Sequence, residues 1–593
     1  MTPAQVIVLA TPVFLLLIGL EYAWSLRKGR NTYRLNDAIN SISLGMLSQV
    51  SAVLVPLLTL GIYTAAFTSL ALVRNDAFWL SPAGWLLALV FYDFLYYWHH
   101  RAGHEVALFW AAHVVHHQSQ DYNLSTALRQ TSTGPLFGWV FYLPMALAGV
   151  PPLVFGVVAL IDLLYQFWVH TEHVGKLGWF DRWFCSPSNH RVHHAVNDEY
   201  LDRNYGGVLV AWDRLFGSFR EEAAPCVYGT RSPLDSWDPL WSNGEVYWSL
   251  LKDSWHARSW ADKLRVWIKP PGWRPADVAA RFPRAPFDIA KVQRYHPPVG
   301  KGVAVFAALQ FLGLLAGVAW FLWNAHVLEI GHAVVWLAAL CAGMWAVGAV
   351  LQGRIGVLEV LVIEAAALAT AGSATGVGWV YVVFKPLALV LLIGVVARRC
   401  GALRLPPAYE ALRLPPAYGG LLLAALVFSL VGDVFLIFDG YFIAGLASFL
   451  VAHVCYIALF RQDVPWFPRR AVLAGTLAAG ALMYAFLFPH LGAVLKAAVA
   501  AYTLVIALMA AQAIGRALVV RDKAAYGVAA GAVLFMLSDA LLAVNRFAMP
   551  LPLAQFWVLG TYYAAQVLIA RNVVMVRPAT ARAAAAHPRT AAA

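Results

Sequence analysis

Apolar runs long enough to cross a membrane recur along the whole chain. The hydrocarbon core of a bilayer is about 30 Å thick, and a helix of about 20 apolar residues spans it. The pattern predicts an all-α, polytopic membrane protein with about fifteen transmembrane helices. The expected spans are 5–25, 40–66, 83–98, 136–151, 154–170, 302–323, 333–351, 356–373, 379–397, 421–438, 441–460, 471–488, 492–514, 525–545 and 553–571.

Polar stretches divide these spans into regions. Residues 1–300 hold the first five spans, and the only long polar stretch, 174–300, is expected to form a cytoplasmic cap on them. Residues 301–375 are predicted to be connecting transmembrane helices, and residues 376–576 a second membrane domain. The Ala-, Arg- and Pro-rich tail 577–593 is expected to be disordered.

Basic residues set the expected orientation. In the predicted topology they gather in alternate loops, which the positive-inside rule places in the cytoplasm. These loops contain Arg27–Arg34, Arg354, Arg398–Arg399, Arg461–Arg470, Arg516–Lys523 and Arg571. The first span lacks a small-residue cleavage site, so we expect it to remain as an anchor. The whole pattern favours a bacterial cytoplasmic membrane protein with segment 99–194 at the inner face.

The composition agrees with a membrane location. Hydrophobic residues make up 61% of the chain and charged residues 12%. The 43 Lys and Arg residues exceed the 31 Asp and Glu residues, which suits contact with anionic lipid headgroups. No basic patch interleaves with soluble aromatic surface, so we expect no nucleic-acid partner. The five cysteines are scattered singly and favour neither a disulfide framework nor a CxxC metal site. The oligomeric state stays open.

Eleven of the 18 histidines lie between His99 and His194, in four tight groups. Residues three or four apart on a helix share a face, so the spacing aligns eight imidazoles, and His170 is expected to be a ninth. The predicted metal ligands are His100, His104, His113, His116, His117, His170, His190, His193 and His194. One ion does not need so many nitrogens, whereas two ions with four or five each do. The sequence therefore predicts a two-metal site.

The donor set narrows the choice of metal and of chemistry. Imidazoles without a nearby thiolate suit iron, copper, nickel or zinc better than magnesium or calcium. Substrates at a membrane surface are mostly CH₂ groups, which activated dioxygen at iron attacks and hydrolysis does not. The competing hypothesis is a two-zinc hydrolase, although such sites usually include bridging carboxylates. Asp93, Glu105 and Glu172 are instead expected to accept the free ring N–H groups of the ligands.

Three of the histidine groups carry a resemblance to a known family. His100-x3-His104, His113-x2-His116-His117 and His190-x2-His193-His194 resemble the histidine boxes of the fatty acid hydroxylase/sterol desaturase superfamily. Through Asp121–Gln130 and Asn204–Gly207, the stretch from about 80 to 220 is similar to its alkylglycerol monooxygenase branch. The resemblance implies two iron ions, hydroxylation of the O–CH₂ carbon of a glyceryl ether, and release of a fatty aldehyde. It also implies tetrahydrobiopterin or another small external electron donor. His99 and His173 have no place in the pattern and are not expected to be ligands.

Polar residues inside predicted spans mark the second membrane domain, because such residues are costly in hydrocarbon and usually functional. They are Lys385, Asp433, His453, Asp539 and Gln566. Asp433 and Asp539 are predicted to lie at similar depth, where two carboxyl groups of different ionisation provide an acid and a base. The alternative is a structural ion pair between Lys385 and one aspartate.

These residues lie in motifs that resemble the YhhN-type lysoplasmalogenase family over about 379–572. The motifs are Lys385-Pro386, Phe428-Ser429 with Gly432-Asp433, His453, Ser538-Asp539 and Tyr562-Tyr563 with Gln566. The resemblance implies hydrolysis of the vinyl ether of a lysoplasmalogen to a fatty aldehyde. Asp433 and Asp539 would be catalytic, and Lys385, His453 and Gln566 are candidate substrate contacts.

Three hypotheses remain open at this point. The first is an ether-lipid-cleaving monooxygenase with a lysoplasmalogenase-like module. The second is a fatty acid or sterol hydroxylase or desaturase whose C-terminal domain only anchors the protein or admits substrate. The third is a non-enzymatic scaffold with structural metal ions.

Overall fold

The computed structural model describes residues 2–55, 57–401 and 414–573. Within these residues the regular structure is helical, apart from the isolated β-bridges Phe184–Leu209 and Ala195–Tyr228. The chain divides into two compact units, Met1–Ile355 and Gly356–Ala593.

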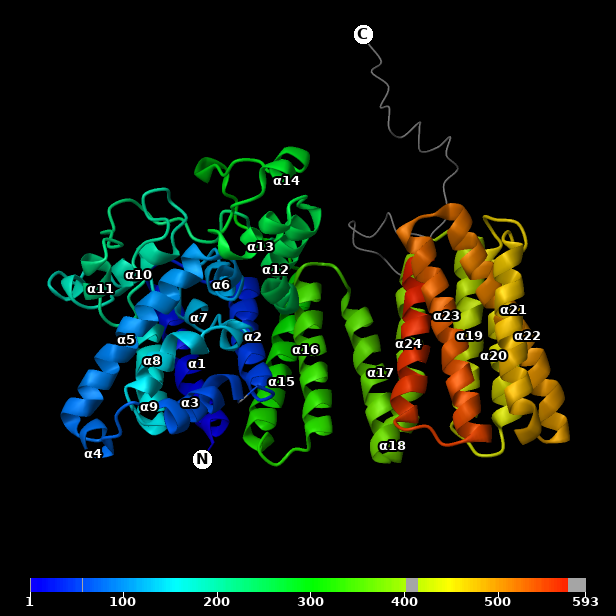
Figure 1. The fold of residues 1–593 in the computed structure, drawn as a ribbon. Coiled ribbons are helices and arrows are strands. Elements are labelled where there is room, and N and C mark those ends of the chain that lie inside the picture. The colour runs from blue at the N-terminus through cyan, green and yellow to red at the C-terminus, as the bar shows by residue number, and fades with distance from the viewer. Residues whose placement is uncertain (1, 56, 402–413, 574–593) are drawn as a thin grey trace, which may run out of the picture. The chain divides into compact units, whose positions relative to one another are not determined.

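The first unit combines long apolar helices with short helices and loops (Figure 1). Its α-helices are α1 (Pro3–Arg27), α2 (Leu35–Ala52), α3 (Ile62–Leu70), α4 (Asp76–Trp79), α5 (Pro82–Glu105), α6 (Ala107–Ala111), α7 (Leu124–Ala127), α8 (Trp139–Leu147), α9 (Pro152–Trp168), α10 (Pro187–His194), α11 (Ala211–Leu215), α12 (Pro239–His256), α13 (Trp260–Ile268), α14 (Ala276–Arg281), α15 (Lys301–Asn324) and α16 (Ile330–Leu351).

The two largest apolar cores described in the first unit hold its long helices together. One lies between α2, α15 and α16 and contains Leu47, Phe321 and Met344. The other joins α3, α5, α8 and α9 and contains Met145 and Val158. The two cores fix the long helices on which the histidine groups depend.

Helix α5 carries the first histidine group in its last turns. Its start is fixed by Ser81, whose Oγ accepts a hydrogen bond from the backbone N–H of Gly84 at 3.2 Å. Glycine is required at this position because a Cβ would lie 2.1 Å from the carbonyl oxygen of Phe78. Since α5 then packs along α8 and α9, His100 and His104 are held at the end of a rigid core.

The second unit is a helical bundle. Its α-helices are α17 (Val357–Thr375), α18 (Gly378–Arg399), α19 (Pro416–Phe435), α20 (Phe442–Phe460), α21 (Arg470–Leu487), α22 (Ala493–Val520), α23 (Lys523–Ala543) and α24 (Ala554–Asn572). They pack in sequential pairs, α17 with α18, α19 with α20, α21 with α22 and α23 with α24. Helix α17 also packs against α24, so the first and last helices meet, around a core that includes Leu426, Tyr456 and Phe535.

Ten of the described helices are long and apolar enough to cross a membrane, namely α1 and α15 to α23. The other five predicted spans fall on α2 with α3, on α5, on α8, on α9 and on α24. Helix α8 has only 9 residues and α9 has 17, because Gly149 to Pro151 break the apolar run between them. The structure confirms an all-α fold with multiple membrane-crossing helices, whereas fifteen spans and a cytoplasmic histidine site stay predictions.

The regions expected from the sequence are distributed over the two units. The expected cap, 174–300, contains α10 to α14 and belongs to the first unit. The expected connecting segment, 301–375, is divided: α15 and α16 belong to the first unit and α17 to the second. The expected disordered tail, 577–593, lies outside the described residues.

Candidate metal centre and second polar cavity

Four short segments of the first unit bring the predicted histidines together. His100 and His104 end α5, and His113, His116 and His117 lie in or next to the 3-10 helix Val114–His117. His170 directly follows α9. Helix α10 supplies His190, His193 and His194, and its start is capped by Ser186. All nine predicted ligands lie in two adjacent clusters.

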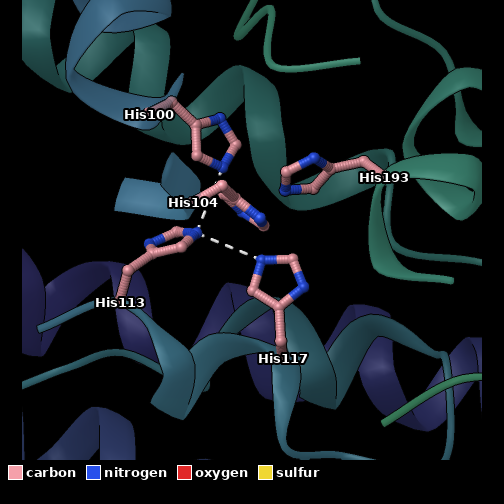
Figure 2. A group of neighbouring side chains, drawn as sticks. All are labelled: His100, His104, His113, His117 and His193. Atoms are coloured by element: carbon pink, nitrogen blue, oxygen red, sulfur yellow. Dashed lines mark hydrogen bonds between the residues drawn. The ribbon is translucent and has the colours of Figure 1, made fainter. Parts of the chain in front are cut away.

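The first cluster contains five imidazoles: His100, His104, His113, His117 and His193. Figure 2 shows the five rings converging on one centre, and one ligand atom from each lies within 4.8 Å of all the others. The Nε2 atom of His113 is 3.1 Å from the Nε2 atoms of His100 and of His117. Two nitrogens bound about 2.1 Å from one ion are about 3.0–3.4 Å apart at ordinary coordination angles. The spacing therefore matches ligands of a common ion.

The second cluster contains four imidazoles: His116, His170, His190 and His194. The Nε2 atom of His170 is 3.1 Å from the Nε2 atoms of His116 and of His190. His194 Nε2 is 3.2 Å from His190 Nε2. The rings of His117 and His194 stack with their centroids 4.3 Å apart, so the two clusters are direct neighbours.

Backbone carbonyls hold the outward nitrogens of these rings. The Nδ1 atoms of His100, His116, His170 and His193 lie 2.7–3.0 Å from the carbonyl oxygens of Tyr205, Arg129, Gln166 and Arg203, respectively. A carbonyl only accepts, so each Nδ1 carries the proton and each Nε2 lone pair points inward. The remaining outer contacts are His104 Nδ1 to Asp202 at 3.5 Å and His190 Nδ1 to the Cys185 sulfur at 4.0 Å.

The three carboxylates expected to support the ligands have other partners. Asp93 accepts hydrogen bonds from the backbone of Val208 and Leu209 and from the indole of Trp212. Glu105 pairs with Arg101 at 2.9 Å, and Glu172 pairs with Arg30 at 2.5 Å. The expectation fails because the loops that run behind the rings already supply carbonyl acceptors, a contact that residue types cannot reveal.

Burial and donor chemistry both fit a pair of bound cations. Burial lowers the pKa of His116 to about 4 and lowers the pKa values of His193 and His194 well below their ordinary value, so these rings are neutral near pH 7. Neutral imidazole is the form that binds metal. The Nε2 atoms of His104 and His193 are buried without a hydrogen-bond partner, and both lie in the first cluster. A cation at the centre of the first cluster would satisfy these two inward lone pairs.

A cavity of 380 Å³ adjoins both clusters. One part of its wall contains His100, His113, His116 and His170. Another, mostly apolar part is formed by α1, α2, α9 and α15, and it includes Asp162 and Gln166 of α9. None of the described residues that line it is a lysine or an arginine. His99 also lines this cavity, but its Nδ1 lies 3.2 Å from the hydroxyl of Tyr142, and it belongs to neither cluster. His173 is likewise outside both clusters.

The second unit contains a separate cavity of 560 Å³. Lys385, Asp433 and Tyr562 meet on one side: the Lys385 Nζ is 3.5 Å from Asp433, and the Tyr562 hydroxyl donates to Asp433 at 2.6 Å. On another side the Tyr502 hydroxyl donates to Asp539 at 2.5 Å.

The other two candidates of this unit, His453 and Gln566, lie behind the residues that form the cavity wall. His453 Nε2 lies 2.9 Å from the Tyr502 hydroxyl and 3.7 Å from Asp539. Gln566 accepts a hydrogen bond from Tyr456 at 2.5 Å. His453 therefore contacts polar groups of the wall, and the side-chain nitrogen of Gln566 lies 3.5 Å from the hydroxyl of Tyr562, which is also in the wall. Neither His453 nor Gln566 is among the residues that line the cavity. Sequence reasoning missed Tyr502, because a tyrosine inside an apolar helix gives no signal of its own.

Comparisons with known families assign the two halves of the chain differently. The fatty acid hydroxylase family profile matches residues 85–218, which contain both histidine clusters. The YhhN family profile matches residues 380–573, which contain the second cavity's carboxylates. No solved structure matches the chain.

Individual relatives follow the same division. Alkylglycerol monooxygenase of Homo sapiens is 41% identical over 268 residues, which are 45% of this chain and 59% of the human protein. Alkylglycerol monooxygenase of Xenopus tropicalis is 36% identical over 312 residues, 52% of this chain and 68% of the relative. Lysoplasmalogenase TMEM86A of Bos taurus is 37% identical over 160 residues, 26% of this chain and 64% of the relative. The region matched to the human alkylglycerol monooxygenase is therefore less than two thirds of that protein's length.

Proposed function

Because the chain belongs to the alkylglycerol monooxygenase family, we propose that its first unit is a membrane di-iron monooxygenase that cleaves the ether bond of alkylglycerol-type lipids. The observation that carries this proposal is the meeting of nine imidazoles in two adjacent clusters at the wall of a largely apolar cavity. Among its described residues the same wall has no lysine or arginine, which suits an uncharged lipid chain.

The proposed ligand sets are His100, His104, His113, His117 and His193 for one iron and His116, His170, His190 and His194 for the other. The irons would supply the activation of dioxygen. In the overall reaction one oxygen atom enters the C–H bond beside the ether oxygen, and the other leaves as water. Two electrons come from tetrahydrobiopterin or another small external donor. The resulting hemiacetal releases a fatty aldehyde and the glycerol part of the lipid.

The protein's own residues position the substrate for this step. The apolar side chains of α1, α2 and α15 would hold the alkyl chain and exclude water. The carbonyl contacts behind His100, His116, His170 and His193 keep each ring in one orientation, which fixes the place where the reacting carbon must lie. We place these clusters at the cytoplasmic face of a bacterial inner membrane, in keeping with the basic loops.

We propose that the second unit hydrolyses the vinyl ether of a lysoplasmalogen. This reaction needs a proton on the alkenyl carbon and water at the adjacent carbon, which is acid and base work. Each carboxyl group accepts a hydrogen bond from a phenol, but Asp433 also lies beside an ammonium group, whereas Asp539 lies beside an imidazole. Two carboxyl groups in different surroundings are suited to opposite roles. Both units would then release fatty aldehydes from ether lipids.

The test is aldehyde release by purified protein from alkyl- and alkenyl-glycerolipids, with and without oxygen. We expect close to two irons per chain, oxygen-dependent release from the alkyl lipid, and oxygen-independent release from the alkenyl lipid. Stoichiometric zinc with activity indifferent to oxygen would contradict the first proposal. Oxidation of fatty acids or sterols alone, with no release from an alkenyl lipid, would favour a hydroxylase with an anchoring second unit.

A further inference from the structure

Arg546 is an arginine at the opening of the second cavity. It lies in the π-helical turn Val544–Ala548 that ends α23, it is exposed, and it lines the cavity. Its guanidinium carbon is 4.4 Å from the centroid of the Phe442 ring. Within the described part of the chain, no ion pair or hydrogen bond occupies this guanidinium. A positive group that is stacked, lines a cavity and lacks an acceptor is placed to bind an anion.

The turn that carries Arg546 is held in place. The side-chain oxygen of Asn545 accepts a hydrogen bond from the backbone N–H of Leu551 at 2.9 Å. Phe547 packs with Leu487 and Val499, which joins the turn to α21 and α22. The guanidinium is therefore presented from a packed element.

The other lysine or arginine of the cavity wall is already engaged. Lys385 pairs with Asp433, and its side chain is only 4% exposed. Asp433 also accepts the hydroxyl hydrogen of Tyr562. Of the two described cationic side chains that line the cavity, Arg546 is therefore the exposed one and Lys385 the buried, paired one.

We infer that Arg546 binds the phosphate group of the ether-lipid substrate and sets the headgroup preference of the second unit. This inference rests on the proposed vinyl-ether hydrolysis. Arg546 lies seven positions after Asp539, which is roughly 10 Å along a helix. The glycerol part of a lysoplasmalogen is shorter than this, and the long arginine side chain covers the difference. A guanidinium binds phosphate through two parallel charge-assisted hydrogen bonds.

The first unit offers the opposite surroundings. Its cavity has no lysine or arginine among the described lining residues, so no positively charged side chain there favours a phosphate. The two units of one chain would therefore prefer different headgroups, uncharged in the first and phosphate-bearing in the second.

The experiment compares two alkenyl lipids in a phosphate-free detergent, a lysoplasmalogen with its phosphate and a 1-alkenylglycerol without one. Arg546→Gln should lower kcat/KM for the phosphate-bearing lipid about 10- to 100-fold, mainly through KM, which is the scale of a hydrogen bond between charged groups. It should leave kcat/KM for the phosphate-free lipid unchanged. Arg546→Lys should recover part of the kcat/KM that is lost for the phosphate-bearing lipid. The matched control is Lys496→Gln: Lys496 stacks on Phe488 at 4.0 Å, at the same end of the bundle, and does not line the cavity.

Two outcomes would overturn the inference. An equal loss with both lipids would mean that Arg546 supports the fold rather than the headgroup. A loss seen only in phospholipid nanodiscs, and absent in detergent, would mean that Arg546 contacts bilayer phosphates instead of the substrate's.

A binding measurement separates this inference from the proposed activity. Saturated 1-alkyl lysophospholipid cannot undergo vinyl-ether hydrolysis, and under anaerobic conditions it is not oxidised. One outcome is that this lipid binds to the wild type with a lower Kd than to Arg546→Gln while neither protein hydrolyses an alkenyl lipid. That result would support the phosphate site and contradict the proposed hydrolysis. If the rate of hydrolysis does not depend on Arg546, the result supports the proposed hydrolysis and contradicts the phosphate site.

Discussion

The two cavities of this chain are built on opposite principles. In the first unit, loops and short helices bring neutral imidazoles together, and two of their inward nitrogens are buried without a protein partner. In the second unit, long helices carry carboxyl, phenol and ammonium groups that bond to one another. The first site leaves inward lone pairs for bound cations, whereas in the second the carboxyl groups already have protein partners and, among the described residues, the unpaired buried side-chain atom is Nδ1 of His453.

This difference matches the chemistry proposed for each unit. A saturated C–H bond beside an ether oxygen has neither a leaving group nor an acidic proton, so the protein must recruit metal and dioxygen. A vinyl ether accepts a proton on carbon, so positioned carboxyl groups suffice. Treatments that remove ions should therefore affect the units differently.

The largest effect is expected from the imidazoles. Replacing His117 or His194 with Ala should abolish ether oxidation and lower the iron content, because each removes a ligand from one of the clusters. Vinyl-ether hydrolysis by the same variants should persist. Iron analysis and aldehyde release, with and without oxygen, measure both effects.

His173→Ala is the matched control, since His173 belongs to the same segment of the chain and to neither cluster. A loss of iron as complete as that of His117→Ala would show that the ligand sets are drawn wrongly. If both activities vanished together in His194→Ala, the two units would not be independent.

The next effect concerns the carboxyl groups. Asp433→Asn and Asp539→Asn preserve volume but remove an acid or a base, so vinyl-ether hydrolysis should fall on the order of 10²- to 10⁴-fold. Ether oxidation by the first unit should continue. Rates on an alkenyl lipid under anaerobic conditions give the first quantity, and oxygen-dependent rates on an alkyl lipid give the second.

A structural ion pair predicts a different result. If Lys385 and one aspartate only form a structural ion pair, both Asn variants should lower expression and thermal stability, and vinyl-ether hydrolysis and ether oxidation should fall together. Thermal unfolding in detergent, recorded beside the rates, distinguishes a lost catalytic group from a lost support.

Spacing predicted which histidines meet but not how they divide. Residues three and four apart were expected to share a face, and all nine do reach the site. However, His116 and His117 belong to different clusters, because the 3-10 helix Val114–His117 turns adjacent rings toward different centres. In α10, His193 joins the first cluster while His190 and His194 join the second. That division depends on where the segments pack, which the sequence pattern does not contain.

The fold shows the same limit. Long uninterrupted apolar runs predicted α15 to α23 closely, since a helix is the only way to satisfy their backbone in hydrocarbon. The runs near the metal site are interrupted, as at Gly149 to Pro151, and there the structure has shorter helices such as α8 and α9. The carbonyl partners of the imidazoles are invisible to the sequence, because every residue carries a carbonyl.

A smaller effect is expected from the apolar wall of the first cavity. Ala10→Phe would fill space beside the alkyl chain, so the ratio of activity on long to short alkyl lipids should fall about tenfold, within the range of a few methylene contacts. Iron content should not change. Leu9→Phe is the control, because Leu9 is 52% exposed and does not line the cavity. Equal responses of the two variants would place the alkyl chain elsewhere.

The smallest effect is expected at His99, which tests where the metal site ends. His99 lines the cavity beside His100, yet its ring is held by Tyr142 and stacks on Phe141. His99→Phe keeps an aromatic ring and removes one hydrogen bond, so KM should rise about 2- to 10-fold, the effect of one neutral hydrogen bond. The iron content should stay at the wild-type value, whereas His100→Ala should lose it. If His99→Phe also lost iron, then His99 would be a metal ligand rather than only a residue of the cavity wall. The first cluster would then include a second face of α5.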